Sequence, residues 1–274
     1  MSTTVPPVAF IGLGAMGLGM ATNLSRHSYP VRAYDINAAA LSTLTSSFPT
    51  ASSAPSPAEA CAKASVLVVM VATAAQASSV LFGPETGAIH GLPKNATVIL
   101  CSTVPPKFPG EVKAEFAKQG REDIRVVDAP VSGGTIRAGD GTLTILAAGD
   151  VGGTEAEDVL KAMAGPNLWH IDGGLGAGSN VKLLNQLLAG THTAAACEAM
   201  GWAAVLGLDC GWVYEEVTKK GADAKGGRGR GEIWSWMFGN RVPHMLKNDW
   251  TPLSATDIIL KDMVGFCLTW HSTY

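Results

Sequence analysis

Three glycines lie between a short apolar run and a helical stretch near the start of the chain, in the segment Phe10-Ile-Gly12-Leu-Gly14-Ala-Met-Gly17. This G-x-G-x-x-G spacing is constraining because each glycine has its own task. The first allows a tight turn, the second lets the backbone approach a pyrophosphate, and the third lets helix and strand pack closely. The N–H groups and the dipole at a helix start also favour phosphates. The motif therefore predicts a βαβ unit that binds a dinucleotide.

Asp35 follows the second predicted strand, Val31–Tyr34, about 20 residues beyond the middle glycine, where an acid would bond the ribose hydroxyls of the dinucleotide. A carboxylate there would repel a 2′-phosphate, so we expect NAD rather than NADP. Alternatively, Asp35 is the N-cap of a helix over Asn37–Leu44. Arg32, on the same strand, is expected to point the other way. Further cofactor-binding residues are expected within the glycine loop at Leu13, Ala15 and Met16.

Short β-branched runs alternate with helical stretches through the first part of the chain. Strand and helix in alternation imply right-handed crossovers and a parallel sheet covered on both faces, so the predicted fold class is α/β of the doubly wound Rossmann type. Strands are predicted at Val8–Ile11, Val31–Tyr34, Val66–Val71, Thr97–Leu100 and Val126–Asp128. Helices are predicted at Met16–Arg26, Pro57–Ala64 and Glu111–Lys118. Two more strands, Leu143–Ala147 and Leu168–Ile171, are expected to extend the sheet at its far edge.

The glycine-rich segment Gly173–Gly178 interrupts this alternation and predicts a domain boundary. From Ser179 to about Leu208 the sequence contains no proline and is apolar on most helical faces, which favours a long helix buried between packed units. Later segments also have helical spacing, so we expect a nucleotide-binding domain over 1–174 and an all-α domain over 175–274. The later helical segments are Val213–Val217, Ile233–Phe238 and Asp257–Cys267.

Composition excludes several classes of function. Hydrophobic residues make up 47% of the chain and charged residues 16%, as in a soluble globular protein. A net charge of -3 gives no reason to expect nucleic acid or a membrane surface as partner, and no apolar run reaches the ~18 residues of a membrane span. The basic cluster within 219–230 is interpreted as a solvated loop. Five widely spaced cysteines indicate free thiols in a reducing, cytoplasmic setting, with neither disulfides nor a metal site.

Two further segments carry candidate chemistry. Asp128-Ala-Pro-Val-Ser132-Gly133-Gly134 follows a strand, and a hydroxyl beside glycine N–H groups suits a carboxylate, unless Ser132 merely caps a short helix near 135–138. Lys182 lies on the long apolar helix. Burial would disfavour its ammonium form and make it an acid/base near neutral pH. The alternative is a lysine whose stem packs while its head reaches solvent.

Together these segments resemble the β-hydroxyacid dehydrogenase family, which includes 3-hydroxyisobutyrate dehydrogenase, from about Val8 to Asp262. The matching pieces, in order, are Gly12-Leu-Gly-Ala-Met-Gly17, Asp128-Ala-Pro-Val-Ser-Gly-Gly134, Gly176-Ala-Gly-Ser-Asn-Val-Lys182-Leu-Leu-Asn185 and Lys261-Asp262-Met263. The resemblance implies NAD-dependent oxidation of a small 3-hydroxy acid, such as 3-hydroxyisobutyrate or threonate, by a homo-oligomer that is a dimer or tetramer. A member of the family that binds the dinucleotide without catalysis is the alternative function, and an imine reductase is a weaker one, because those relatives usually replace the lysine.

The resemblance also implies a role for individual residues. Lys182 would handle the hydroxyl proton, Ser132, Gly133 and Gly134 would hold the substrate carboxylate, and Asn185 would be a further substrate-binding residue. Cofactor contacts are implied for Thr103, Met70, Val71 and Lys261, the last over either nicotinamide or substrate. Val71 and Ala72 replace the leucine and proline of the family's Met-Leu-Pro segment.

Two features distinguish the C-terminal part of the sequence. The segment Trp236–Leu246 is most similar to the L-threonate dehydrogenase branch of the family, or is simply a helix with an aromatic packing face. Family members continue for several tens of residues of helix past the Lys-Asp pair, whereas this sequence ends at Tyr274. That helix normally contributes to the subunit interface, so this ending leaves the size of the oligomer and full activity open.

Overall fold

The structure is a computed structural model that describes residues 5, 7–219, 235–249, 257 and 259–264. It divides into two compact units. Unit 1 contains the described residues up to Leu183, and unit 2 contains those from Leu184 to Val264. The basic cluster from Lys220 onwards, the end of the chain after Val264, and Ile233 and Trp234 of a predicted helix lie outside the described residues.

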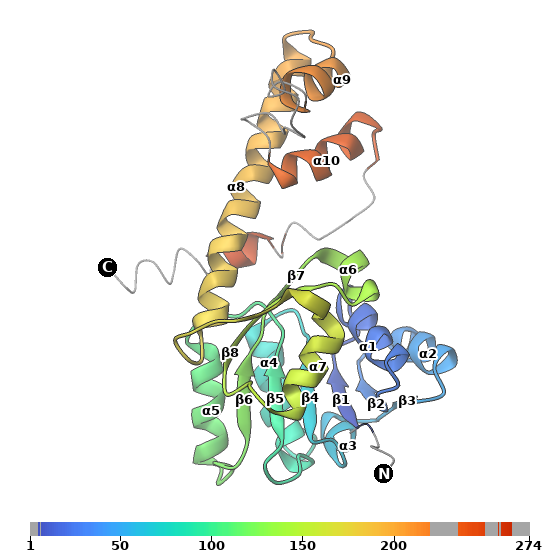
Figure 1. Cartoon of the computed structure of the whole chain (residues 1–274), viewed down its shortest axis with the longest axis vertical. Helices are drawn as coiled ribbons and strands as arrows, with labels where there is room; N and C mark the ends of the chain where they lie inside the picture. The colour runs from blue at the N-terminus through green and yellow to red at the C-terminus, as the bar shows by residue number, and fades with distance from the viewer. Residues whose placement is uncertain (1–4, 6, 220–234, 250–256, 258, 265–274) are drawn as a thin grey trace. The chain divides into compact units, whose positions relative to one another are not determined.

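Unit 1 is built around one sheet with the strand order β3-β2-β1-β4-β5-β6-β8-β7, and β9 pairs with β8 (Figure 1). The six strands from β3 to β6 are parallel, while β8 is antiparallel to β6 and β7. The predicted α/β class and the far-edge position of the last strands are confirmed. The strands are β1 Val8–Ile11, β2 Val31–Tyr34, β3 Ala51–Ser53, β4 Val66–Val69, β5 Thr97–Leu100, β6 Arg125–Asp128, β7 Val131–Ser132, β8 Thr144–Gly149 and β9 Leu168–His170.

Helices cover both faces of this sheet, because alternate residues of each parallel strand point to opposite sides. On one side Val8 and Phe10 pack with residues of α1, α2, α6 and α7, whereas Ala9 and Ile11 pack on the other side with α3, α4 and α5. Each side therefore has its own apolar core. The helices are α1 Gly17–Arg26, α2 Ala38–Ser47, α3 Pro57–Cys61, α4 Ala74–Phe82, α5 Phe108–Lys118, α6 Gly134–Asp140 and α7 Glu155–Ala164, with short 3-10 turns at Ala88–His90 and Gly165–Asn167.

Unit 2 is helical in its described part. It contains most of α8 (Ala177–Val205), then α9 (Cys210–Trp212), a π-helical segment over Val213–Lys219, and α10 (Trp236–Leu246). A small core joins these elements, with the rings of Tyr214 and Phe238 stacked at a centroid distance of 5.9 Å. The predicted long helix and all-α C-terminal part are confirmed. No described helix combines the length and hydropathy required of a membrane span.

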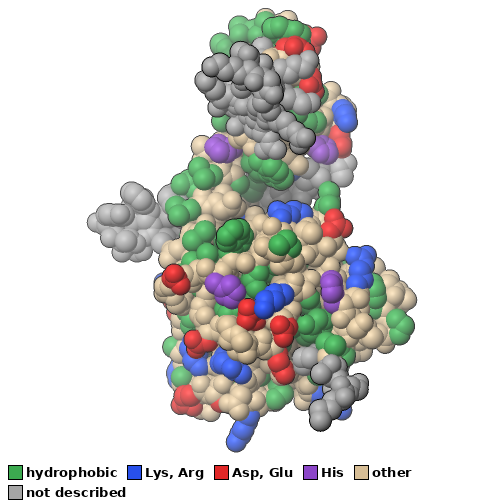
Figure 2. All heavy atoms as spheres, in the orientation of Figure 1, with side chains coloured by type: hydrophobic (Ala, Val, Ile, Leu, Met, Phe, Trp, Pro, Cys, Tyr) green, Lys and Arg blue, Asp and Glu red, His purple; other side chains and the backbone are tan. Residues whose placement is uncertain are grey.

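The predicted burial of α8 is wrong for part of its surface. Leu184 and Leu188 are each 57% exposed, and Trp202 and Val205 are also exposed. Figure 2 shows hydrophobic side chains at the surface over α8 and the helices that follow it. An apolar helix face indicates a surface that packs against another element. The sequence pattern does not distinguish an element of the same chain from one of another molecule.

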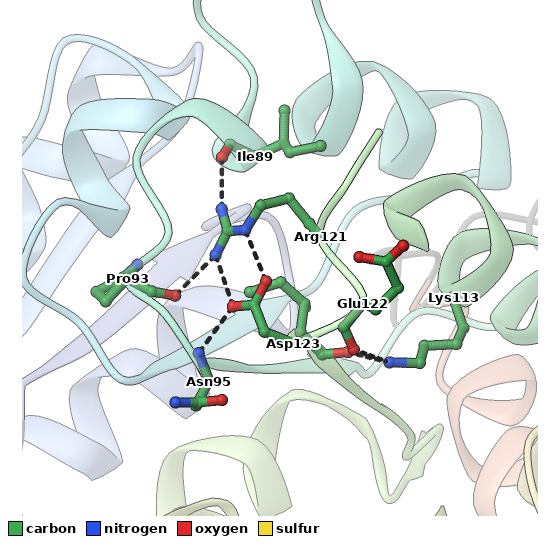
Figure 3. A network of polar contacts seen from close by, with 8 residues as sticks. Ile89, Pro93, Asn95, Lys113, Arg121, Glu122 and Asp123 are labelled. Carbon is green, nitrogen blue, oxygen red and sulfur yellow. Dashed lines mark hydrogen bonds and ion pairs between the residues drawn. The ribbon is translucent and has the colours of Figure 1, made fainter. Parts of the chain in front are cut away.

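A polar network fixes the loops that enter β5 and β6 (Figure 3). The Arg121 guanidinium donates hydrogen bonds to the backbone carbonyls of Ile89 at 3.1 Å and Pro93 at 2.9 Å. It also donates to both carboxylate oxygens of Asp123, at 2.9 and 3.1 Å. The backbone N–H of Asn95 donates to the same carboxylate at 2.8 Å. The guanidinium and this N–H together lower the pKa of Asp123 from 3.8 to about 2.

This network predicts a pH-dependent contribution to stability. Because the folded-state pKa of Asp123 is depressed, the contribution is present above pH about 4 and is lost as the pH falls from about 4 towards 2. Asp123→Asn should lower the free energy of unfolding by about 1 kcal/mol at pH 7, and the difference from the wild type should shrink below pH 4. Urea denaturation at several pH values measures it. Glu122→Gln is the control, because Glu122 accepts the Lys113 hydrogen bond through its backbone carbonyl. An equal loss at all pH values would contradict the prediction.

Candidate active site

The space for a side chain differs between the three glycines of the loop that joins β1 to α1. Gly12 has a φ of +98°, and a Cβ there would lie 2.2 Å from the Met70 carbonyl oxygen. A Cβ on Gly17 would lie 1.9 Å from the carbonyl oxygen of Gly12, so this glycine lets α1 approach the strand. Gly14 differs, because a Cβ on it would meet no atom within 4 Å. Turn, close packing and open approach are the three tasks expected of this motif.

Asp35 lies beside this loop at the end of β2. Its carboxylate accepts hydrogen bonds from the backbone N–H of Leu13 at 2.5 Å and of Asn37 at 2.6 Å. The N-cap of α2 is Asn37, whose side-chain oxygen accepts from Ala39 and Ala40, so the interpretation of Asp35 as that cap is wrong. The Arg32 guanidinium pairs with Glu59 of α3 at 3.8 Å, which agrees with its expected orientation.

The ends of β4 and β5 adjoin the glycine loop. Met70 donates its backbone N–H to the carbonyl of Ile11, and the Val71 N–H donates to the Ser102 hydroxyl at 3.0 Å. Strand β4 therefore ends two residues before the predicted Val71. Ser102 is buried and directly precedes Thr103. Ser102 was not predicted as a functional residue, although a serine two residues beyond the end of β5 was a usable signal.

These residues fit a dinucleotide. The carboxyl ends of β1 and β4 meet where the strand order reverses, which is where open α/β sheets bind ligands. The open space over Gly14 allows a pyrophosphate to approach the start of α1, and the first turn of α1 contains no acidic residue to oppose it. Asp35 directly follows the second strand, where an acid is expected to bond the ribose hydroxyls. The structure therefore brings together Gly12, Gly14, Gly17, Asp35, Met70 and Val71.

The serine–glycine segment forms the turn from β7 into α6. Ser132 ends β7 and is half-buried, and the next two residues, Gly133 and Gly134, have φ values of +139° and +72°. The N-cap of α6 is Gly133, and no side chain caps this helix, so the alternative role of Ser132 as a cap is wrong. Positive φ at both glycines requires residues without a Cβ, which exposes backbone N–H groups beside the hydroxyl.

Lys182 lies near the start of α8 and is 5% exposed, so the alternative of an ammonium in solvent is not supported. The first turn of this helix is held by Asp128, the last residue of β6. The Asp128 carboxylate accepts from the N–H of Gly176 at 3.1 Å and of Ser179 at 2.8 Å, and from the Ser179 hydroxyl at 2.6 Å. Asp128 and Ser179 lie within two of the sequence motifs, but no pattern in the sequence predicts this contact between them.

Asn185 and Lys261 belong to unit 2. There, the buried carboxylate of Asp262 accepts from Gln186 Nε2 at 2.7 Å and pairs with Lys261 Nζ at 2.8 Å. Asp262 thus joins α8 to the helical residues 259–264. A Cβ on Gly190 would lie 2.5 Å from the Met263 sulfur, so that glycine permits the close packing of these two helices. Within the described residues no cluster of three or more His, Cys, Asp or Glu side chains could hold a metal ion.

The strand order, the glycine loop and Asp35 define a Rossmann-type dinucleotide-binding protein with a helical C-terminal part. The NAD binding domain of 6-phosphogluconate dehydrogenase matches residues 7–173, and the NAD-binding region of NADP-dependent 3-hydroxyisobutyrate dehydrogenase matches residues 176–269. The chain belongs to the β-hydroxyacid dehydrogenase family, whose members are NAD(P)-binding oxidoreductases. The resemblance seen in the sequence is thereby confirmed.

Individual relatives of the chain support the same family assignment. The chain is 41% identical to L-threonate dehydrogenase of Cupriavidus necator over 93% of its own length and 80% of the relative, and 37% identical to the Escherichia coli K12 enzyme with the same coverage. A crystal structure of 3-hydroxyisobutyrate dehydrogenase from Salmonella typhimurium superposes with a TM-score of 0.84 at 34% identity, covering 97% of this chain and 87% of that one. The relatives support a catalytic protein over a non-catalytic binder.

Substitutions in the glycine loop should separate folding from cofactor binding. Gly14→Ala adds a Cβ into open space, so thermal stability should stay near that of the wild type while NAD(H) affinity falls roughly tenfold or more. Gly12→Ala must displace the Met70 carbonyl and should lower both the melting temperature and the affinity. Calorimetric binding and thermal denaturation measure the two effects. Unchanged NAD(H) binding by Gly14→Ala would contradict the assignment of this loop.

Proposed function

We propose that the chain oxidises the hydroxyl group of a small 3-hydroxy acid, such as 3-hydroxyisobutyrate or threonate, with Lys182 as the acid/base. The observation that carries the proposal is the burial of this lysine near the start of α8, directly after the turn of helix that Asp128 holds. A buried amine with few water contacts can exchange a proton near neutral pH, which an exposed lysine rarely does.

The proposed chemistry needs a base, a binding site for the substrate carboxylate and a hydride acceptor. A bound nicotinamide supplies the hydride acceptor. Neutral Lys182 accepts the hydroxyl proton, and its ammonium returns one in the reverse direction. The Ser132 hydroxyl and the N–H groups of Gly133 and Gly134 bind the substrate carboxylate and so orient the alcohol.

The remaining assignments follow the family resemblance. Asn185 is proposed as a further substrate-binding residue, and Lys261 and Thr103 as cofactor-contacting residues. NAD is proposed over NADP because the Asp35 carboxylate, at the end of β2, would repel a 2′-phosphate. Threonate is included among the substrates because similar proteins are L-threonate dehydrogenases.

A homo-oligomer is proposed as the working form. The support is the exposed apolar surface of α8, including Leu184 and Leu188, which a second copy of the chain could cover. Sedimentation velocity would show a species heavier than one chain. A cytoplasmic location is proposed because the described cysteines are free thiols, which persist in reducing compartments.

An absorbance assay of NADH formation tests the reaction directly. The purified chain is incubated with a panel of short hydroxy acids that includes 3-hydroxyisobutyrate, L-threonate and L-serine, each with NAD and with NADP. The proposal expects turnover of at least one acid and a higher kcat/KM with NAD. Binding of NAD without turnover of any acid in the panel would favour the non-catalytic alternative instead.

Lys182→Ala should lower kcat by about 10²–10⁴-fold, because it removes the group that accepts the hydroxyl proton. NAD affinity should stay close to that of the wild type, since the glycine loop and Asp35 are unchanged. Steady-state kinetics and calorimetric NAD binding measure both. Lys107→Ala is the matched control, because Lys107 is an exposed lysine paired with Glu111 on α5. A kcat like that of the control would remove Lys182 from the mechanism.

A further inference from the structure

The start of α8 is attached to the sheet by one carboxylate. Asp128 is fully buried, and both of its oxygens accept hydrogen bonds from the first turn of the helix: one from Ser179 Oγ and the other from the N–H groups of Gly176 and Ser179. These partners lie 48 and 51 residues further along the chain. The carboxylate therefore connects two distant parts of unit 1.

The backbone around this contact is closely packed at two glycines. A Cβ on Gly176 would lie 2.2 Å from the Pro106 carbonyl oxygen. A Cβ on Gly178 would lie 2.3 Å from the carbonyl oxygen of Leu146 in β8 and 3.1 Å from that of Asp128. Gly176 therefore lets the chain pass close to Pro106 in the segment after β5, and Gly178 lets the first turn of α8 lie directly against β8 and the end of β6.

Lys182 is three residues after Ser179, one helical turn away on the same face of α8. Three residues of α-helix span about 4.5 Å along the axis, and a hydrogen-bonded helix transmits a shift of its first turn to the next turn. The position of the Lys182 amine in unit 1 therefore depends on where Asp128 holds Ser179. A displacement of about 1 Å at a reacting group can cost about 10²-fold in rate.

The contact also favours a carboxylate over an amide. The groups that face the Asp128 oxygens include three donors, the Ser179 hydroxyl and the N–H groups of Gly176 and Ser179, and an acceptor-only side chain satisfies them. An asparagine would have to turn its NH₂ towards Ser179 Oγ, so that this hydroxyl accepts instead of donating, and it would carry no negative charge. A negative charge is further stabilised by the N-terminal end of the helix dipole. Burial acts against this charge and raises the pKa of Asp128, while the hydrogen bonds from Ser179 and Gly176 offset part of that effect.

We propose that Asp128 is a positioning residue for catalysis, which holds the first turn of α8 so that Lys182 stands where it can take the substrate proton. This inference rests on the proposed role of Lys182. Asp128 acts through the helix and does not touch substrate or cofactor.

The first experiment is a comparison of Asp128→Asn with the wild type. We expect kcat to fall roughly tenfold to a hundredfold, with the KM for NAD and the calorimetric NAD affinity unchanged, because the glycine loop on β1 is not altered. Ser179→Ala removes the hydroxyl donor and keeps the backbone donors, so it should lower kcat in the same way by a smaller factor. It also serves as the test if Asp128→Asn fails to fold.

Asp123→Asn is the matched control. Asp123 is also an aspartate that accepts backbone and side-chain hydrogen bonds, but it lies before β6 whereas Asp128 ends that strand. This control should lose stability and keep its kcat. If Asp128→Asn, or Ser179→Ala in its place, keeps the kcat of the wild type, or if the Asp123 control loses kcat equally, the positioning role is wrong.

A double-mutant cycle with Lys182→Ala separates positioning from general damage. Residual turnover is measured as NADH formed under single-turnover conditions. If Asp128 acts through Lys182, adding Asp128→Asn, or Ser179→Ala if needed, to Lys182→Ala should cause no further loss. The same fold loss in both backgrounds would overturn the inference while leaving the role of Lys182 intact. A Lys182→Ala variant with wild-type kcat would instead reject the proposed function, so the two failures are distinct.

Discussion

Burial of both faces of a parallel sheet leaves this chain few places for chemistry. Alternate residues of β1 belong to two separate apolar cores, so helices cover both faces of the sheet and a ligand cannot reach them. What remains open is the edge where the parallel strands end, and the backbone must change direction there. The glycine loop, Asp35, Met70, Val71 and Ser102 all follow strands at that edge. Their proximity is a consequence of strand direction, which brings together segments that are far apart in the sequence.

The same edge also anchors the helix that carries Lys182. Strand β6 contributes Asp128 at its carboxyl end, and the N–H groups at the start of α8 are donors that need an acceptor once they are buried. A carboxylate is costly in an apolar interior, yet it becomes tolerable where several donors converge on it. Cys101, at the end of β5, shows the other outcome, because burial and the nearby Asp128 raise the pKa of its thiol and keep it protonated. Burial thus raises the pKa of both groups at this edge, and for Asp128 the hydrogen bonds from the start of α8 offset part of that effect.

The sequence predicted those parts of the fold that depend on local patterns. Strands β1, β2 and β5 begin and end at the predicted residues. β1 and β5 are buried throughout, whereas β2 alternates buried and half-buried residues, and both patterns are local. Strand β3, Ala51–Ser53, was missed because it is a polar edge strand that exists only through its pairing with β2. Helices α4 and α7 lay in segments for which no element was predicted. The end of β4 was placed too late, since the Val71 N–H bonds to Ser102, a partner 31 residues away.

The same limit explains which part of the candidate site could be predicted. Glycine spacing and an acid after a strand are local signals, and the structure places the glycine loop between β1 and α1 and Asp35 directly after β2, as the sequence predicted. The acceptor role of Asp128 is not local, because its donors are 48 and 51 residues away. The apolar faces of α8 gave the opposite error, since Leu184 and Leu188 looked like core residues but are exposed in one chain. A residue's chemical type is therefore evident from sequence, whereas the group that satisfies it depends on which strand ends and helix starts the fold brings together.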